Sequence, residues 1–149
     1  GSLFAKKNTE LNFSNSGTAS RLIIGALSTT PNIKVKLIGD HSLNKRSMKK
    51  LIILMNKFGA EFSPKNKFNF PLSISSSNYP IGISYNSGTS AQLKSAVILA
   101  GLNSYGNTEI VEHLRSRDHT ENMLKRNKHA IKIREGISKK KWYVNKICK

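Results

Sequence analysis

The chain has 149 residues and a formal net charge of +17, and 38% of its residues are hydrophobic. This length and composition suit one domain with a packed core. The sequence contains no apolar run long enough for a membrane helix and no secretory signal, and its single cysteine, Cys148, excludes an internal disulfide. These features predict a single cytoplasmic domain over residues 3–149.

The excess of basic residues, 25 Lys and Arg against 8 Asp and Glu, suggests nucleic-acid binding as one function. Most lysines are nevertheless scattered over predicted loops and exposed helix faces, and only Lys139–Lys141 form a tight cluster, beside Trp142 and Tyr143. No aromatic RNA-binding motif, zinc-finger spacing or helix-turn-helix pattern accompanies them. A basic nucleic-acid-binding module therefore stays as an alternative, against a simple solvated basic surface.

In chain order, the first predicted elements are an extended segment at residues 3–13, a helix from Thr18 to Leu27 and a strand from Ile33 to Ile38. The strand is predicted from its alternation of apolar and polar residues. A second helix is predicted from Lys45 to Phe58, because its apolar residues share one face, and Gly59 suits its C-terminal end.

Residues 60–88 form short alternating runs separated by prolines, a pattern typical of strands. The later predictions are a helix over Ser90–Leu102, a strand over Thr108–Val111, a helix over His119–Arg126 with Asp118 as its cap, and strands over Ala130–Arg134 and Trp142–Ile147. The alternation of strands and helices predicts an α/β (α+β) fold in which helices pack on mixed sheets.

One polar turn occurs twice. Asn15-Ser16-Gly17-Thr18 precedes the first helix, and Asn86-Ser87-Gly88-Thr89 precedes the helix predicted from Ser90. The offset that carries Asn15 onto Asn86 also carries Arg46 onto Arg117. Such self-similarity predicts two related units, at about residues 11–62 and 82–135.

The first copy of the turn has the features of an anion site. Asn15 or Ser16 suits the N-cap, and Gly17 has no Cβ to keep a ligand from the backbone. The unpaired N–H groups of a helix N-terminus favour a phosphate or carboxylate, and Arg21 lies one turn further on. The alternative is a well-capped core helix, but the repetition favours a site.

Arg46 and Arg117 precede the second and fourth predicted helices, where a planar guanidinium can grip a carboxylate or phosphate with two hydrogen bonds. Ser90-Ala91-Gln92 brings a hydroxyl, free N–H groups and an amide together, which suits an oxyanion or a polyol phosphate. Its alternative is capping by Ser90 with Gln92 exposed. The four histidines lack metal-ligand spacing, and His119 is predicted to be structural.

Four segments in this order resemble the 5-enolpyruvylshikimate-3-phosphate synthase family, the 3-phosphoshikimate 1-carboxyvinyltransferases of the shikimate pathway. They are LNFSNSGTASRL (11–22), GDHSLNKRSMK (39–49), SAQLKSA (90–96) and SRDHTENML (116–124). The related UDP-N-acetylglucosamine enolpyruvyl transferases match the last two segments less well. The resemblance implies a lobe of three similar helix-over-sheet units, of inside-out α/β barrel type, with two units present here.

The resemblance implies transfer of an enolpyruvyl group from phosphoenolpyruvate to the 5-hydroxyl of shikimate 3-phosphate through a tetrahedral intermediate, without a metal or organic cofactor. The positions that it assigns to phosphoenolpyruvate are Asn15, Gly17, Arg46 and Gln92. Those that it assigns to shikimate 3-phosphate are Ser90, Ala91, Gln92, Ser116 and Arg117.

Two departures from the family pattern matter. Ser47 stands where the family usually has proline, and we expect this to change only the start of the helix. The family's N-terminal lysine–serine–arginine motif, its acid/base aspartate and lysine, and further anion-binding arginines have no counterpart here. The chain thus resembles the major part of one lobe, with the other lobe as its partner. We expect it to carry half of a site, with no catalytic residue, and to be inactive alone.

Overall fold

The computed structural model describes residues 9–114, 116–126, 131–135 and 140–145. In chain order its elements are β1 (Thr9–Asn12), α1 (Gly17–Ser28), β2 (Lys34–Ile38), α2 (His41–Asn44), α3 (Lys49–Lys57), β3 (Glu61–Ser63), β4 (Leu72–Ser75), β5 (Ser84–Ser87), α4 (Ala91–Gly101), β6 (Asn107–Glu112), α5 (His119–Leu124), β7 (Ile131–Glu135) and β8 (Lys140–Asn145). Within these described ranges, no helix combines the length and the apolar character that crossing a membrane requires.

The strands form two four-stranded sheets with the same topology. Their strand orders are β1-β2-β4-β3 and β5-β6-β8-β7. In each sheet the first two strands are parallel, joined through α1 or α4, and the other pairs are antiparallel. The predicted α/β fold with mixed sheets is confirmed, and the equal strand orders give the repeated sequence pattern a structural counterpart.

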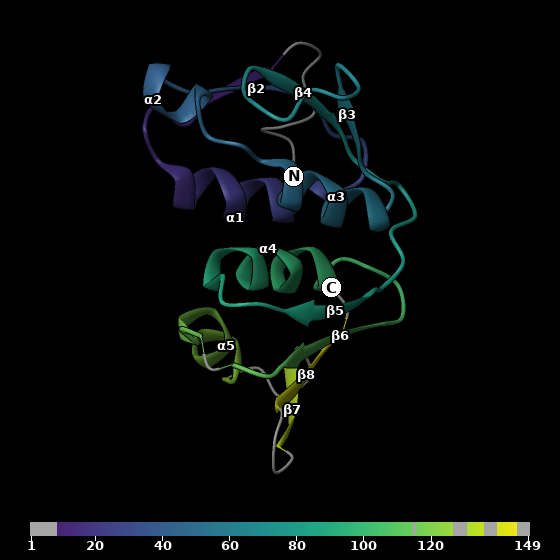
Figure 1. The fold of residues 1–149 in the computed structure, drawn as a ribbon. Helices are drawn as coiled ribbons and strands as arrows, with labels where there is room; N and C mark the ends of the chain where they lie inside the picture. The colour runs from purple at the N-terminus through teal and green to yellow at the C-terminus, as the bar shows by residue number, and fades with distance from the viewer. Residues whose placement is uncertain (1–8, 115, 127–130, 136–139, 146–149) are drawn as a thin grey trace.

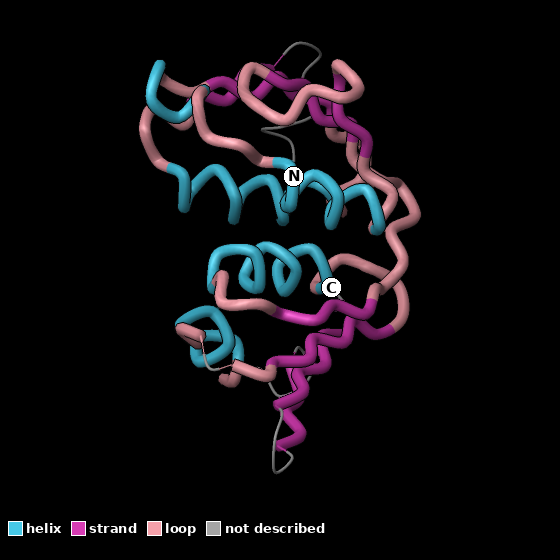
Figure 2. Tube along the Cα trace, in the orientation of Figure 1, coloured by secondary structure: helices cyan, strands magenta, loops and turns pink. Residues whose placement is uncertain are grey.

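The helices α1, α3 and α4 lie between the two sheets (Figure 1), so that cyan helices fill the middle of Figure 2 and magenta strands its two outer sides. This inside-out arrangement places the apolar side chains of both units in one continuous core, which includes Leu37, Met55 and Ile98. In the described part of the chain the two sheets remain separate and form no closed barrel.

The two units meet where α1 packs against α4, with both helices running in the same direction (Figure 1). Gly25 of α1 allows this close approach. A Cβ at that position would lie 2.5 Å from the carbonyl oxygen of Ala96 and 2.8 Å from its Cα. Because these are backbone atoms, a side chain at residue 25 requires the helices to separate.

The helix predicted over Lys45–Phe58 is wrong at its start, because α3 begins only at Lys49, and no helix is predicted where the short helix α2 (His41–Asn44) lies. Asp40 caps α2 by accepting a hydrogen bond from the Leu43 N–H at 2.8 Å. Between the helices, the Met48 N–H donates to the Phe68 carbonyl at 2.7 Å. This partner lies far along the chain, so helical periodicity alone does not reveal the break.

The offset that carries Asn15 onto Asn86 is also wrong as a structural alignment. Ser16 and Ser90 are the N-caps of α1 and α4, so Ser16 corresponds to Ser90 in the structure and not to Ser87. Gly17 begins its helix, whereas Ser87 is the last residue of β5 and Gly88 precedes the cap. Relative to the N-cap of the following helix, the Asn-Ser-Gly-Thr tetrapeptide therefore lies three residues earlier in the second unit than in the first.

At the second unit's end, Asp118 occupies the cap position of α5 but makes no capping hydrogen bond through its side chain. The two closing strands are present, at Ile131–Glu135 and Lys140–Asn145. The predicted strand residues Ala130, Lys146 and Ile147 lie outside the described residues.

We expect Gly25→Ala to destabilise the chain by about 2 kcal/mol. Overpacking typically costs about 1–3 kcal/mol, and clashes with backbone atoms at 2.5 and 2.8 Å place Gly25 at the upper end of this range. Subtracting the ~1 kcal/mol that alanine gains over glycine in helix propensity leaves about 2 kcal/mol. Urea unfolding measures the difference. Gly88→Ala is the matched control, because no atom lies within 4 Å of a Cβ there. Equal stability of the two variants would contradict the close helix packing.

Candidate functional site

A side-chain bridge joins the first turns of α1 and α4. The Gln92 Oε1 accepts a hydrogen bond from Arg21 Nη1 at 2.8 Å, and the Gln92 Nε2 donates to Thr18 Oγ1 at 2.9 Å. Both helices begin on the same side of the molecule (Figure 1). The bridge therefore fixes groups from the two units at one place, where the N–H ends of two helices favour an anion.

Two guanidinium groups meet beside Gly17. Arg21 Nη1 donates to the Gly17 carbonyl at 3.0 Å, and a Cβ on Gly17 would lie 2.9 Å from Nη1 of both Arg21 and Arg46. Burial, and then the positive charge of Arg46, lower the pKa of Arg21. None of the ion pairs seen among the described residues includes either arginine. The pair thus presents positive charge that an anionic ligand can neutralise.

A hollow of about 400 Å³ opens beside this bridge. Its lining consists of Arg21, Ser90, Gln92 and Leu93, together with residues 47–51 at the start of α3. Lys49 and Lys50 in that segment add positive charge. The volume is in the range typical of small-molecule sites. The arrangement suits a small, strongly anionic molecule.

The other predicted phosphoenolpyruvate residue, Asn15, lies in the turn before α1, where its carbonyl accepts from the Gly17 N–H at 3.1 Å. Its side chain is exposed. Among the predicted shikimate 3-phosphate residues, Ser90 caps α4 through the Leu93 N–H at 3.4 Å, and Ala91 begins the helix. Ser90 therefore both caps α4 and lines the hollow.

Ser116 and Arg117 make no described contact with the bridge. Ser116 instead donates to Glu112 Oε1 from its N–H at 2.9 Å and from its Oγ at 2.7 Å. Arg117 is exposed and lies just before α5, which packs on α4 on the side where α1 and α4 begin (Figure 1). His119 is also exposed.

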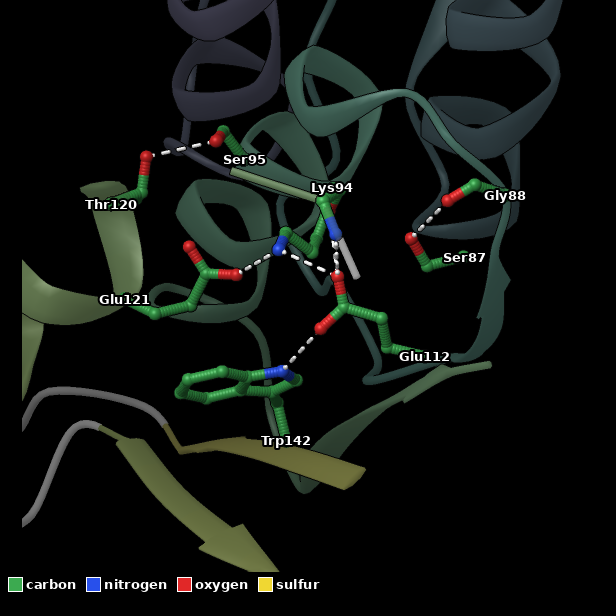
Figure 3. Close-up of polar contacts among 9 residues, drawn as sticks. Ser87, Gly88, Lys94, Ser95, Glu112, Thr120, Glu121 and Trp142 are labelled. Atoms are coloured by element: carbon green, nitrogen blue, oxygen red, sulfur yellow. Dashed lines mark hydrogen bonds and ion pairs between the residues drawn. The ribbon is translucent and has the colours of Figure 1, made fainter. Parts of the chain in front are cut away.

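Sequence reasoning missed a buried ion cluster. Figure 3 shows the Lys94 ammonium between the carboxylates of Glu112 and Glu121, with the Trp142 indole directed at Glu112. A lysine within the apolar segment of a predicted helix was the available signal. Across the described ranges, no group of three or more His, Cys, Asp and Glu side chains is arranged to hold a metal ion.

The pKa of Glu112 is set by competing effects. Burial raises it, but hydrogen bonds from the Ser116 hydroxyl and N–H, from Lys94 and from Trp142 together lower it to about 2. The net direction follows because these donors all stabilise the carboxylate. Glu112 is therefore ionised wherever the cluster is intact at ordinary pH.

The fold and the site define an α/β protein of two like units, with basic and polar side chains gathered at the paired N-termini of α1 and α4. Residues 1–146 match the family model of EPSP synthase (3-phosphoshikimate 1-carboxyvinyltransferase). The chain belongs to the EPSP synthase family.

Relatives named 3-phosphoshikimate 1-carboxyvinyltransferase occur in Paracoccus denitrificans, at 42% identity over 81% of this chain, and in Aquifex aeolicus, at 44% identity over 82%. A solved EPSP synthase from Acinetobacter baumannii matches 95% of the chain with a TM-score of 0.79 and 33% identity. The chain spans only 27%, 28% and 31% of these three proteins.

We expect Gly17→Ala to weaken the binding of inorganic phosphate, used as a probe anion, by roughly fivefold, on the order of 1 kcal/mol, because its Cβ displaces two charged hydrogen-bond donors. The free energy of unfolding should change little, since both guanidinium groups end flexible side chains. NMR titration measures the affinity, and Gly88→Ala is again the control. Unchanged affinity in Gly17→Ala would argue against an anion held between Arg21 and Arg46.

The lowered pKa of Glu112 predicts an acid-sensitive contribution to stability. The unfolded chain, in which this carboxyl has its ordinary pKa near 4.5, binds the proton first as the pH falls. The contribution is therefore present above pH 4.5 and is lost between about pH 4.5 and 2. Urea unfolding at several pH values should show this loss, and Glu112→Gln should remove it. If the free energy of unfolding falls equally with pH between 4.5 and 2 in the original chain and in Glu112→Gln, the prediction is contradicted.

Proposed function

We propose that this chain forms the substrate-binding part of one lobe of an enzyme that transfers an enolpyruvyl group from phosphoenolpyruvate to the 5-hydroxyl of shikimate 3-phosphate. In this reaction the 5-hydroxyl loses its proton and its oxygen adds to C2 of phosphoenolpyruvate, while C3 gains a proton. The tetrahedral intermediate then loses phosphate from C2 and a proton from C3, which restores the double bond. Family membership supports the reaction class. The observation that carries the proposal is the convergence of Arg21 and Arg46 on Gly17, joined by Gln92 from the other unit.

Phosphoenolpyruvate is assigned to the turn of α1. Arg46 and Arg21 neutralise its phosphate or carboxylate, Gly17 leaves space for it, Asn15 shapes the turn and Gln92 reaches it from α4. Paired guanidinium groups suit such a dianion because each offers planar, charged donors. The bridge of Gln92 to Arg21 and Thr18 fixes the amide before the ligand arrives.

Shikimate 3-phosphate is assigned to the beginning of α4. Ser90, Ala91 and Gln92 offer a hydroxyl, helix N–H groups and an amide, while Ser116 and Arg117 add contacts from the segment before α5. The helix N-terminus favours the phosphate, and Arg117 adds a charge that no described carboxylate neutralises.

The proton-transfer groups belong to the rest of the enzyme, which we propose as the partner of this chain, in the cytoplasm. Relatives are more than three times as long as the aligned part, and the chain covers 27% of the Paracoccus enzyme. We expect binding without turnover. An assay for phosphate release from the two substrates measures this. Turnover by the purified chain would contradict the proposal that the proton-transfer groups lie in the rest of the enzyme.

An NMR titration of the labelled chain tests binding. We expect shikimate 3-phosphate to shift the amides of residues 90–92 and 117, and phosphoenolpyruvate to shift those of residues 15–18. Arg46→Gln should weaken phosphoenolpyruvate binding about tenfold, on the order of 1.4 kcal/mol. Arg126→Gln is the matched control, because it removes the same charge at an exposed position after α5.

The titration is repeated at two salt concentrations. A specific site keeps the same shifted residues at both, whereas general attraction to a +17 surface spreads the shifts over the lysines and fades with salt. Equal affinities in Arg46→Gln and Arg126→Gln would contradict the assignment of phosphoenolpyruvate to Arg46.

A further inference from the structure

The buried cluster of Lys94, Glu112 and Glu121 lies within the second unit. The side chains of Lys94 and Glu121 are 0% exposed and that of Glu112 is 5% exposed. Lys94 Nζ lies 3.1 Å from Glu112 Oε1 and also contacts Glu121. The buried oxygens of Glu121 have no further hydrogen-bond partner in the described part of the chain, so its charge depends on Lys94.

The fold itself does not require these charges. In the first unit Leu37 of β2, Leu43 of α2 and Leu51 of α3 are buried, and the ion pair described there, Lys36–Glu10, lies at the surface with side chains 56% and 50% exposed. Ser20 holds the position on α1 that Lys94 holds on α4 relative to the N-cap, and it is also buried and donates to the Gly17 carbonyl. Buried ion clusters contribute no more stability than well-packed apolar side chains and often less. The second unit therefore keeps the cluster for another reason.

The cluster holds the segment between β6 and α5 at both ends. Glu112, the last residue of β6, accepts two hydrogen bonds from Ser116 at Oε1 and one from Trp142 Nε1 at Oε2, at 3.2 Å. Glu121 fixes the first turn of α5 to Lys94, and Thr120 hydrogen-bonds Ser95 of α4 at 2.8 Å (Figure 3). Arg117 lies between these two attachments.

Glu112 at one end and Glu121 at the other both pair with Lys94. Lys94 lies on α4, one turn after its N-cap Ser90. Any motion of the segment containing Ser116 and Arg117 relative to the start of α4 must break contacts in the cluster. An ion cluster suits this task because charged hydrogen bonds have strict geometry, whereas apolar contacts tolerate sliding.

We infer that Lys94, Glu112 and Glu121 are positioning residues that hold Ser116 and Arg117 at a fixed place beside Ser90–Gln92. That the held segment contacts shikimate 3-phosphate rests on the function proposed above. The cluster itself touches no ligand; its effect is to order, before binding, two stretches that are separated in sequence.

The test replaces the three charged side chains by apolar ones of similar size, in the variant Lys94→Met/Glu112→Leu/Glu121→Leu. We expect this variant to fold, to exchange the Ser116 amide hydrogen at least tenfold faster than the original chain, and to bind shikimate 3-phosphate at least tenfold more weakly. Phosphoenolpyruvate binding near Arg46 should change less than twofold. Hydrogen exchange and NMR titration give these quantities.

The matched control is Lys141→Met/Glu109→Gln. It removes an ion pair of 3.1 Å in the same sheet whose side chains are 33% and 32% exposed. We expect it to leave both Ser116 exchange and shikimate 3-phosphate binding unchanged. Glu112→Gln is the second variant if the triple replacement does not fold, because Lys94 keeps Glu121 as its partner; it should accelerate Ser116 exchange in the same direction.

The outcomes separate this inference from the proposed function. If the original chain binds no shikimate 3-phosphate, the proposed function fails for the isolated chain, while Ser116 exchange still tests the cluster. Unchanged Ser116 exchange in a folded variant overturns the inference. Faster exchange with unchanged shikimate 3-phosphate affinity also overturns it, because the cluster then orders a segment that does not serve the ligand.

Discussion

The close packing of α1 against α4 is the constraint on which the rest of the structure depends. Gly25 lets the two backbones meet at Ala96, and the two helices run in the same direction. Their N-termini consequently lie on one side of the molecule, where Gln92 reaches Arg21 and Thr18. Without this packing, Gln92 could not reach Arg21 and Thr18. The proposed binding site therefore depends on how the two helices pack.

Two groups of basic side chains differ in whether a carboxylate neutralises them. Lys94 is buried and neutralised by two carboxylates, so it stabilises an arrangement of the chain. Arg21 and Arg46 lie close together without a carboxylate from the described residues, and the positive charge of Arg46 contributes to the lowered pKa of Arg21. The first arrangement is neutralised within the protein, and the second leaves positive charge that suits an anion. The difference lies in the partners and not in the number of basic residues.

The two units share a topology and differ in what fills the corresponding interior. The first has buried leucines on β2, α2 and α3 (Leu37, Leu43 and Leu51), whereas the second contains a buried ion cluster. A common strand order therefore leaves each unit free to specialise, the first around a glycine turn with two arginines and the second around an ordered segment before α5. Both specialisations face the side on which α1 and α4 begin.

The sequence by itself determined the elements and the family. Local patterns identify α1, α4 and the strands because apolar periodicity and capping residues act over a few positions. The motifs at residues 11–22 and 90–96 likewise carry the resemblance without any coordinates. The start of α3 at Lys49 escaped this reasoning because the Met48 N–H, just before it, donates to the distant Phe68 carbonyl. The sequence also did not reveal that Ser16 corresponds to Ser90, because the second Asn-Ser-Gly-Thr tetrapeptide aligns Ser16 with Ser87, three residues earlier.

Only the tertiary structure decided which side chains meet. Arg21 and Gln92 are 71 residues apart, and Glu112 and Trp142 are 30 apart, so no local pattern relates them. Lysine is normally exposed, and the apolar segment around Lys94 signals its burial, but the sequence does not show its partners, because the neutralising carboxylates come from β6 and α5. The packing of helices and strands brings these groups together, and a sequence pattern read over a few neighbouring residues cannot show which distant segments pack against each other.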